Sequence, residues 1–122
     1  MVHIQRSTHC GNSPKNKKAE DLVIALESGD TTQLAEALDT KAIWHSESKT
    51  LSSAQDILTH LQAKSLPESV HIDIVMSHGK TGAVNGTRKK GSQSQGFCHL
   101  LEFTSATCKT IGRIVSYEHH AT

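Results

Sequence analysis

Apolar residues recur every three or four positions through the first part of the chain, the spacing that places them on one face of an α-helix. The clearest set is Ala19, Leu22, Val23 and Leu26. Ser13 is a suitable N-cap, Pro14 fits the first helical position, and Gly29 can adopt the left-handed conformation that ends a helix. This pattern predicts a helix over residues 14–28.

Two shorter helices are expected next, each opened by the spacing of a capping box. Asp30 and Gln33 predict a helix over residues 31–39. Its buried residues would be Leu34, Ala37 and Leu38. Ser52 and Gln55 predict a third helix. Its apolar side would be Ile57, Leu58 and Leu61.

Strands account for the remaining regular structure. The segment KAIWHSES, residues 41–48, is β-prone and precedes the third helix. After Pro67 the apolar residues alternate with polar ones, the period of a β-strand. In residues 70–77 one face would hold Val70, Ile72, Ile74 and Met76. Further strands are expected over residues 83–89, 97–105 and 110–119, with a polar connector over residues 89–96.

The resulting order, α-α-β-α-β-β-β-β, predicts an α+β domain. Three helices of the N-terminal half must pack on one face of a curved antiparallel sheet, which gives a cone. The expected domain covers residues 14–119, between an arm over 1–13 and a tail over 120–122. The concave space between helices and sheet is the default ligand site.

Composition and charge exclude several function classes. The 122 residues carry 13 basic and 12 acidic side chains, so no general field attracts nucleic acid or a membrane surface. The basic runs at Lys15–Lys18 and Arg88–Lys90 are interpreted as solvated. No apolar run is long enough to span a membrane, and the first twenty residues lack the apolar region of a signal peptide. We expect a cytoplasmic protein.

The cysteines and histidines do not form a recognisable metal pattern. Cys10, Cys98 and Cys108 have no CxxC spacing, which argues against disulfides and zinc. Two further groups were considered as metal ligands: His3, His9 and Cys10 at the start, and His119 and His120 at the end. Neither matches a known ligand spacing, so neither a metal nor a cofactor is expected. Cys98 and Cys108 are interpreted as buried, unreactive thiols.

The run LVIALESGDTTQLAEALDTKAIWHSES, residues 22–48, resembles the opening of nuclear transport factor 2-like proteins. The helix SSAQDILTHL and the strand TIGRIVSY fit the same pattern, so the resemblance covers residues 14–119. Residues 10–15 also match a subgroup of uncharacterised bacterial members. The superfamily includes ketosteroid isomerase, limonene epoxide hydrolase, scytalone dehydratase, polyketide-cyclase-like proteins and non-enzymatic binding modules. The resemblance implies a cone-shaped domain with a pocket, acting as a homodimer.

Most catalytic positions of ketosteroid isomerase hold other residues here. The general-base position falls on Ser46, the tyrosine position on Leu22, and the protonated carboxylic acid position on His99. A hydroxyl does not remove a carbon-bound proton near neutral pH without an activating partner. The resemblance therefore implies that steroid-isomerase chemistry of the usual kind is absent.

The other enzymes of the superfamily need different sets of catalytic residues. The epoxide hydrolase needs paired carboxylates and an arginine converging on a water, and the dehydratase needs His, Asp and Tyr. The polar strand residues available for these roles are His71, Asp73, Glu102, Arg113 and Tyr117. Alternation does not bring a full set inward: Glu102 should face outward, and the facing of Arg113 and Tyr117 is left open.

The leading hypothesis is a small-molecule-binding domain with a largely apolar pocket. The expected ligand-binding residues are Leu22, Leu26, Trp44, Ser46, Phe97, His99 and Leu101. Trp44 could instead be plain core, and His99 could be a core histidine. The dimer would form through the outer sheet face, where Val75, Cys98 and Leu100 are expected. Two alternatives stay open: an isomerase, cyclase or dehydratase using His99 as acid or base, and an interaction module whose pocket is filled by Trp44, Phe97 and Phe103.

Overall fold

A computed structural model describes residues 1–8 and 13–120 of the chain. Within them it contains three helices, α1 (Pro14–Ser28), α2 (Thr31–Ala37) and α3 (Ala54–Ala63). The strands are β1 (His3–Gln5), β2 (Leu38–His45), β3 (Thr50–Leu51), β4 (Ser69–His78), β5 (Thr81–Lys90), β6 (Gln93–Phe103) and β7 (Ile111–His120). The expected α+β class is confirmed, with β1 and β3 as additions.

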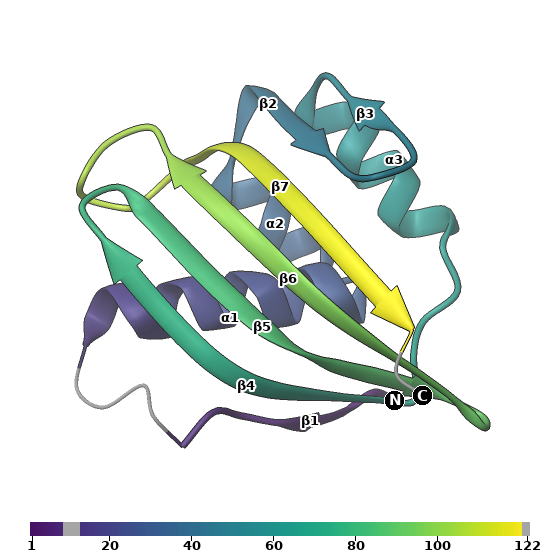
Figure 1. Ribbon diagram of the computed structural model, residues 1–122. Helices are drawn as coiled ribbons and strands as arrows, with labels where there is room; N and C mark the ends of the chain where they lie inside the picture. Colours follow the sequence, from purple (N-terminus) through teal and green to yellow (C-terminus); the bar gives the residue numbers. More distant parts are fainter. Residues whose placement is uncertain (9–12, 121–122) are drawn as a thin grey trace.

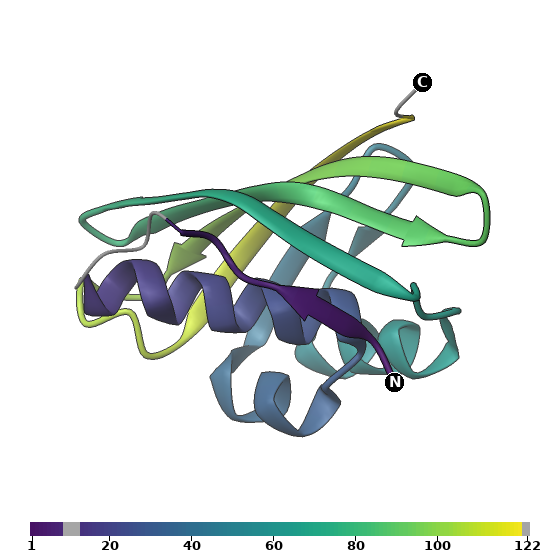
Figure 2. The same cartoon turned by 90° about the horizontal axis from the view of Figure 1, so that it is seen from below.

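One sheet of order β1-β4-β5-β6-β7-β2-β3 joins all the strands (Figure 1). Strands β4 to β7 form an antiparallel meander, whereas β1 pairs with β4 and β2 pairs with β7 in parallel. All three helices lie on the same side of this sheet, as Figure 2 shows from below. None of the described helices has the length and apolar character that a membrane crossing requires.

The long helix α1 begins and ends as expected. The Ser13 hydroxyl accepts a hydrogen bond from the Asn16 N–H at 3.2 Å. Gly29 has φ 72° and its N–H bonds to the carbonyl of Ala25, which closes the helix. The apolar stripe is buried against the sheet, so α1 carries the core of the domain.

The two shorter helices differ from the prediction at one end each. Helix α2 ends at Ala37 because Leu38 adopts an extended backbone and starts β2, so the predicted end at residue 39 is wrong. Helix α3 is capped by Ser53 rather than Ser52. The extended backbone of Ser53, with φ −156° and ψ 159°, lets its hydroxyl accept from the Asp56 N–H at 3.1 Å.

A bulge in β4 overturns the predicted alternation of that strand. Ile72 pairs with Gly86 and Ile74 with Asn85, so one extra residue, Asp73, is inserted. The faces exchange after Ile72: Val75 is 6% exposed, whereas Ile74 is 51% exposed. The prediction that Val75 lies on the outer face is therefore wrong. Gly86 permits the bulge, since a Cβ there would stand 2.1 Å from a backbone oxygen of β4.

The predicted connector over residues 89–96 is also wrong. Strand β5 continues to Lys90 and β6 starts at Gln93, so only Gly91 and Ser92 form the turn. Gly91 supplies the positive φ of 61° that a two-residue hairpin needs. Polar composition misled the prediction, because this end of the hairpin borders a polar cavity instead of the core.

The later strands alternate as expected. On β6 the residues Phe97, His99, Leu101 and Phe103 are buried, whereas Glu102 is exposed. Arg113 and Tyr117 on β7 are also exposed and lie opposite Glu102 and Cys98, so both face outward. Cys98 and Cys108 are free thiols, and burial raises the pKa of Cys98, which does not favour a nucleophile.

No group of three potential metal ligands gathers within residues 1–8 and 13–120. His9 and Cys10, which entered one of the considered metal groups, lie outside the described residues.

Candidate functional site

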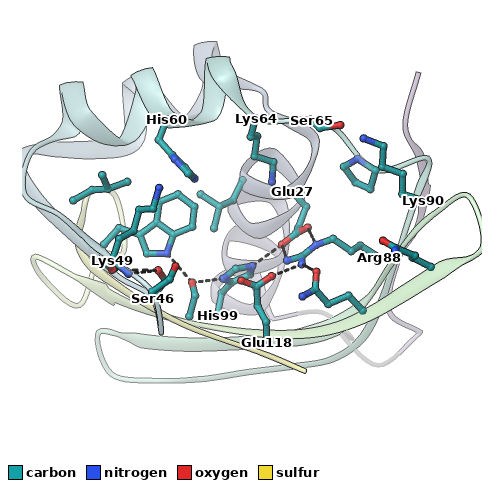
Figure 3. A pocket seen from close by; sticks show the side chains of 18 of the residues that line it. Glu27, Ser46, Lys49, His60, Lys64, Ser65, Arg88, Lys90, His99 and Glu118 are labelled. Carbon is teal, nitrogen blue, oxygen red and sulfur yellow. Dashed lines mark hydrogen bonds and ion pairs between the residues drawn. The ribbon is translucent and has the colours of Figure 1, made fainter. Parts of the chain in front are cut away.

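A cavity of about 460 Å³ opens between α3 and β2 on one side and strands β5, β6 and β7 on the other (Figure 3). Among the described residues that line it, only Leu26, Trp44, Leu51 and Pro67 are apolar. The charged and imidazole side chains are Glu27, Lys49, His60, Lys64, Arg88, Lys90, His99 and Glu118. Most of the residues that line the cavity are therefore polar or charged.

The last turn of α1 places a carboxylate, Glu27, beneath this cavity. Its side chain is 2% exposed. The Arg88 guanidinium donates to both of its oxygens, at 2.6 and 2.7 Å, and His99 Nε2 lies 2.7 Å from Oε2. Burial by itself would raise the pKa of Glu27, but the hydrogen bonds from Arg88 and His99 together with the charge of Arg88 outweigh it and hold that pKa far below 4.5. Glu27 is an ionised, fully engaged carboxylate.

Arg88 on β5 joins this carboxylate to a second one. Besides Glu27, its guanidinium donates to Gln95 Oε1 at 2.6 Å and to the carboxylate of Glu118. It also lies 5.2 Å from the ring centroid of Phe97. The two carboxylates outweigh the effect of burial and raise the pKa of Arg88. The interpretation of Arg88 as a solvated loop residue is wrong, although Lys89 and Lys90 are exposed.

His99 connects Glu27 to Ser116 and Trp44. The Trp44 Nε1–H donates to the Ser116 hydroxyl at 2.8 Å, and His99 Nδ1 lies 2.5 Å from the same oxygen. Because Glu27 can only accept, the proton of a neutral His99 belongs on Nε2. The Ser116 hydroxyl then donates to Nδ1 while it accepts from Trp44. In this arrangement the hydrogen-bonding groups of Trp44, Ser116 and His99 are all paired. The pairing fixes the Trp44 ring in the cavity wall.

Helix α3 and the cavity rim contribute positive charge. Lys64 and His60 project from the α3 side into the cavity, as Figure 3 shows. The His60 ring meets Trp44 edge-on at 5.6 Å between centroids. Burial lowers the pKa of Lys64, and the charge of Arg88 adds to this while Glu27 and Glu118 oppose it. Burial together with the charges of Lys49 and Lys64 lowers the pKa of His60.

The structure brings together some of the residues expected to bind a ligand. Leu26, Trp44, Ser46 and His99 line the cavity. Leu22, Phe97 and Leu101 do not; they are 1%, 3% and 1% exposed and belong to the core. Their inclusion assumed that the whole space beneath the sheet is a pocket, whereas side chains fill one end of it.

Sequence reasoning missed Glu27, Lys64, Arg88, Ser116 and Glu118. A signal existed for Glu27, because it continues the buried series Ala19, Val23 at the i+4 spacing. A carboxylate on a buried stripe requires a partner. No comparable signal marks Lys64, which lies just after the last residue of α3.

No protein-family model and no curated protein matches the sequence. Solved structures do match. A candidate ketosteroid isomerase from Kribbella flavida DSM 17836 superposes with a TM-score of 0.76 at 14% identity, over 88% of this chain and 79% of that one. An NTF-2 like protein of unknown function from Burkholderia xenovorans LB400 gives 0.73 at 10% identity, over 90% and 89%. This chain has the nuclear transport factor 2-like fold. A third match, an LEH-like epoxide hydrolase from M. tuberculosis, gives 0.66 at 16% identity, over 84% and 76%.

At these identities the nuclear transport factor 2-like fold is shared, and the function does not follow from it. Of the polar strand residues considered for enzymes of this fold, His71, Asp73, Glu102, Arg113 and Tyr117 do not line the cavity. The carboxylates and the arginine that do converge there are Glu27, Arg88 and Glu118.

Proposed function

We propose that this chain is a small-molecule-binding domain whose ligand occupies the cavity between α3 and strands β5 to β7. The observation that carries the proposal is the buried row Trp44–Ser116–His99–Glu27–Arg88 at the cavity wall. Removing charges from water costs free energy, and a core of similar volume could be built from apolar residues. A small number of positioned polar groups at the wall of an open cavity is typical of a ligand site.

The character of the lining supports a ligand with a polar group. The sequence led us to expect a small apolar molecule in an apolar pocket. Trp44, Leu26, Leu51 and Pro67 still offer apolar surface, but most of the other residues that line the cavity carry polar or charged groups. An open cavity, with Phe97 and Phe103 in the core rather than plugging it, supports binding over the alternative of an interaction module with a filled pocket.

A thermal-shift screen of metabolites tests this proposal, because a ligand that binds only the folded state raises Tm with concentration. The variant Ser65→Trp places a large ring at the exposed cavity rim and should abolish the shift. Ser92→Trp, in the exposed turn and outside the cavity lining, should leave it unchanged. A shift that survives Ser65→Trp would contradict binding in this cavity.

A hydrolase is a second candidate, favoured by the carboxylate–guanidinium–carboxylate set of Glu27, Arg88 and Glu118. The Glu118 side chain is 39% exposed and could accept a proton from a water in the cavity. Hydrolysis of styrene oxide by the wild type, lost in Glu118→Gln, would support it. The earlier alternative, with His99 as acid or base, meets an obstacle: both of its ring nitrogens are already hydrogen-bonded. Turnover of ketones with acidic C–H bonds, lost in His99→Ala, would restore it.

We also propose that the chain forms a homodimer through the outer sheet face. Ile74, Met76 and Tyr117 are 51%, 58% and 55% exposed there, and Leu100 lies between them on β6. Such an apolar surface on a sheet favours association. Sedimentation velocity should show a dimer that Tyr117→Lys converts to monomer, whereas Thr107→Lys in the exposed loop does not. A wild-type monomer at every concentration tested would contradict the dimer.

A further inference from the structure

Lys64 is a cation that forms no ion pair with any residue that the structure describes. It follows α3 directly, where its extended backbone turns the chain away from the helix, and its side chain projects into the cavity (Figure 3). Among residues 1–8 and 13–120, no carboxylate lies within ion-pair distance of its ammonium group. A partly buried ammonium with no partner destabilises the folded protein.

The two carboxylates that line the cavity pair with other cations, and among the described residues neither forms an ion pair with Lys64. Glu27 already receives Arg88 and His99, and Glu118 receives Arg88. The lining contains four basic side chains, Lys49, Lys64, Arg88 and Lys90, against the two carboxylates Glu27 and Glu118, so its formal charge with neutral histidines is +2. The excess is positive, and its innermost unpaired member is Lys64.

We propose that the cavity ligand is a small organic carboxylate, whose carboxylate group binds Lys64 and whose flat apolar body rests against Trp44. This inference builds on the proposed binding function and gives its ligand a chemical class. The hydrogen bond to Ser116 and the T-shaped contact with the His60 ring hold Trp44, so its ring is positioned before any ligand arrives. Lys49 and Lys90 stand at the exposed rim, where they attract an anion from solution.

The burial that lowers the pKa of Lys64 agrees with this assignment. An anion beside the ammonium favours its charged form and offsets the free-energy cost of burying that charge. The same cavity should reject an organic cation, because the ammonium of Lys64 would repel it.

Isothermal calorimetry of the full chain tests the ligand class. The probes are aromatic monocarboxylates such as 1-naphthoate, each paired with its primary amide and with the amine in which an aminomethyl group replaces the carboxylate. At least one acid should bind, with its amide and its amine at least about tenfold weaker, because hydrogen bonds to charged groups are the stronger ones. The affinity of the acid should fall as the salt concentration rises.

Two variants test whether the carboxylate of the ligand binds Lys64. Lys64→Met keeps the length of the side chain and removes the charge. It should lower the affinity for the acid by roughly tenfold or more and leave the affinity for the amide unchanged. Lys17→Met, exposed on α1 and outside the cavity lining, is the matched control and should change neither. Circular dichroism establishes that each variant is folded.

The outcomes separate this inference from the binding function itself. Binding of amides or amines as tight as that of the acids would overturn the anion assignment and leave the cavity as a binding site. An acid that binds Lys64→Met as well as the wild type would overturn the role of Lys64. The absence of binding by every acid, amide and amine would overturn the ligand class, and the metabolite screen with Ser65→Trp would then decide on the cavity.

Discussion

The space between α1 and the sheet has two ends of opposite character. Along the middle of α1, Leu22 and Val23 belong to the same buried cluster as Leu101 and Phe103, and all four are nearly inaccessible to solvent. Near its end, the same helix presents Glu27 to Arg88 and His99 beneath an open cavity. Helix α1 and strand β6 contribute to both: they present Leu22 and Leu101 to the core and Glu27 and His99 to the cavity, which α3 and β2 also line.

The difference teaches how this fold separates stability from function. At the apolar end the residues fill the volume and have no unmet requirement. At the polar end Glu27 is fully satisfied, whereas Lys64 is not, and the cavity stays open. The predictions below test whether the two ends respond differently to equivalent changes.

The largest effect is expected for Glu27→Ala. It leaves the half-buried Arg88 without its main partner and His99 without an acceptor, so the free energy of unfolding should fall by roughly 3–5 kcal/mol. Urea denaturation measures it. The matched control is Glu36→Ala on the exposed side of α2, expected within about 0.5 kcal/mol of wild type. Equal small losses for both variants would show that the network at the polar end does not stabilise the fold.

Leu101→Ala should lower the free energy of unfolding by roughly 2–5 kcal/mol through lost burial and the void that remains. The same denaturation experiment measures this loss at the apolar end. Ligand binding should survive, because Leu101 does not line the cavity. If Leu101→Ala folded but no longer bound the ligand, the two ends would be coupled.

The pH dependence of stability should distinguish the ends. The folded-state pKa of Glu27 lies below its ordinary 4.5, so below that pH the unfolded chain binds a proton that the folded one does not. Glu27 therefore stabilises the fold above about pH 4.5 and loses this contribution as the pH falls. Urea midpoints from pH 7 to pH 3 should show a shallower decline in Glu27→Gln than in wild type, while Leu101→Ala keeps the wild-type slope.

The smallest expected effect is an increase in the free energy of unfolding. Lys64→Met should raise the free energy of unfolding of the ligand-free protein by roughly 0.5–1 kcal/mol, because a poorly solvated charge is removed. Calorimetric melting without ligand measures it. A destabilised Lys64→Met would show that the ammonium has a structural partner, which would also weaken its assignment as an anion receptor.

The fold could be predicted from the sequence to a large extent. Helix α1 was predicted with its true ends because Ser13, Pro14 and Gly29 act locally. The bulge at Asp73 and the hairpin turn at Gly91 were not predicted, since a bulge depends on the register with the neighbouring strand. Four predicted ligand residues line the cavity, and three do not.

The sequence by itself determined the order of elements, the single buried stripe of α1 and the inward face of β6 that carries His99. Each follows from a local period, which is a property of neighbouring residues. Only the tertiary structure decided that Glu27, Arg88, His99 and Glu118 meet, and that Lys64 lines the same cavity with no ion pair to a described residue. These residues are far apart in the chain. The strength of the interactions between their charges depends on distances and burial that only the packed structure sets.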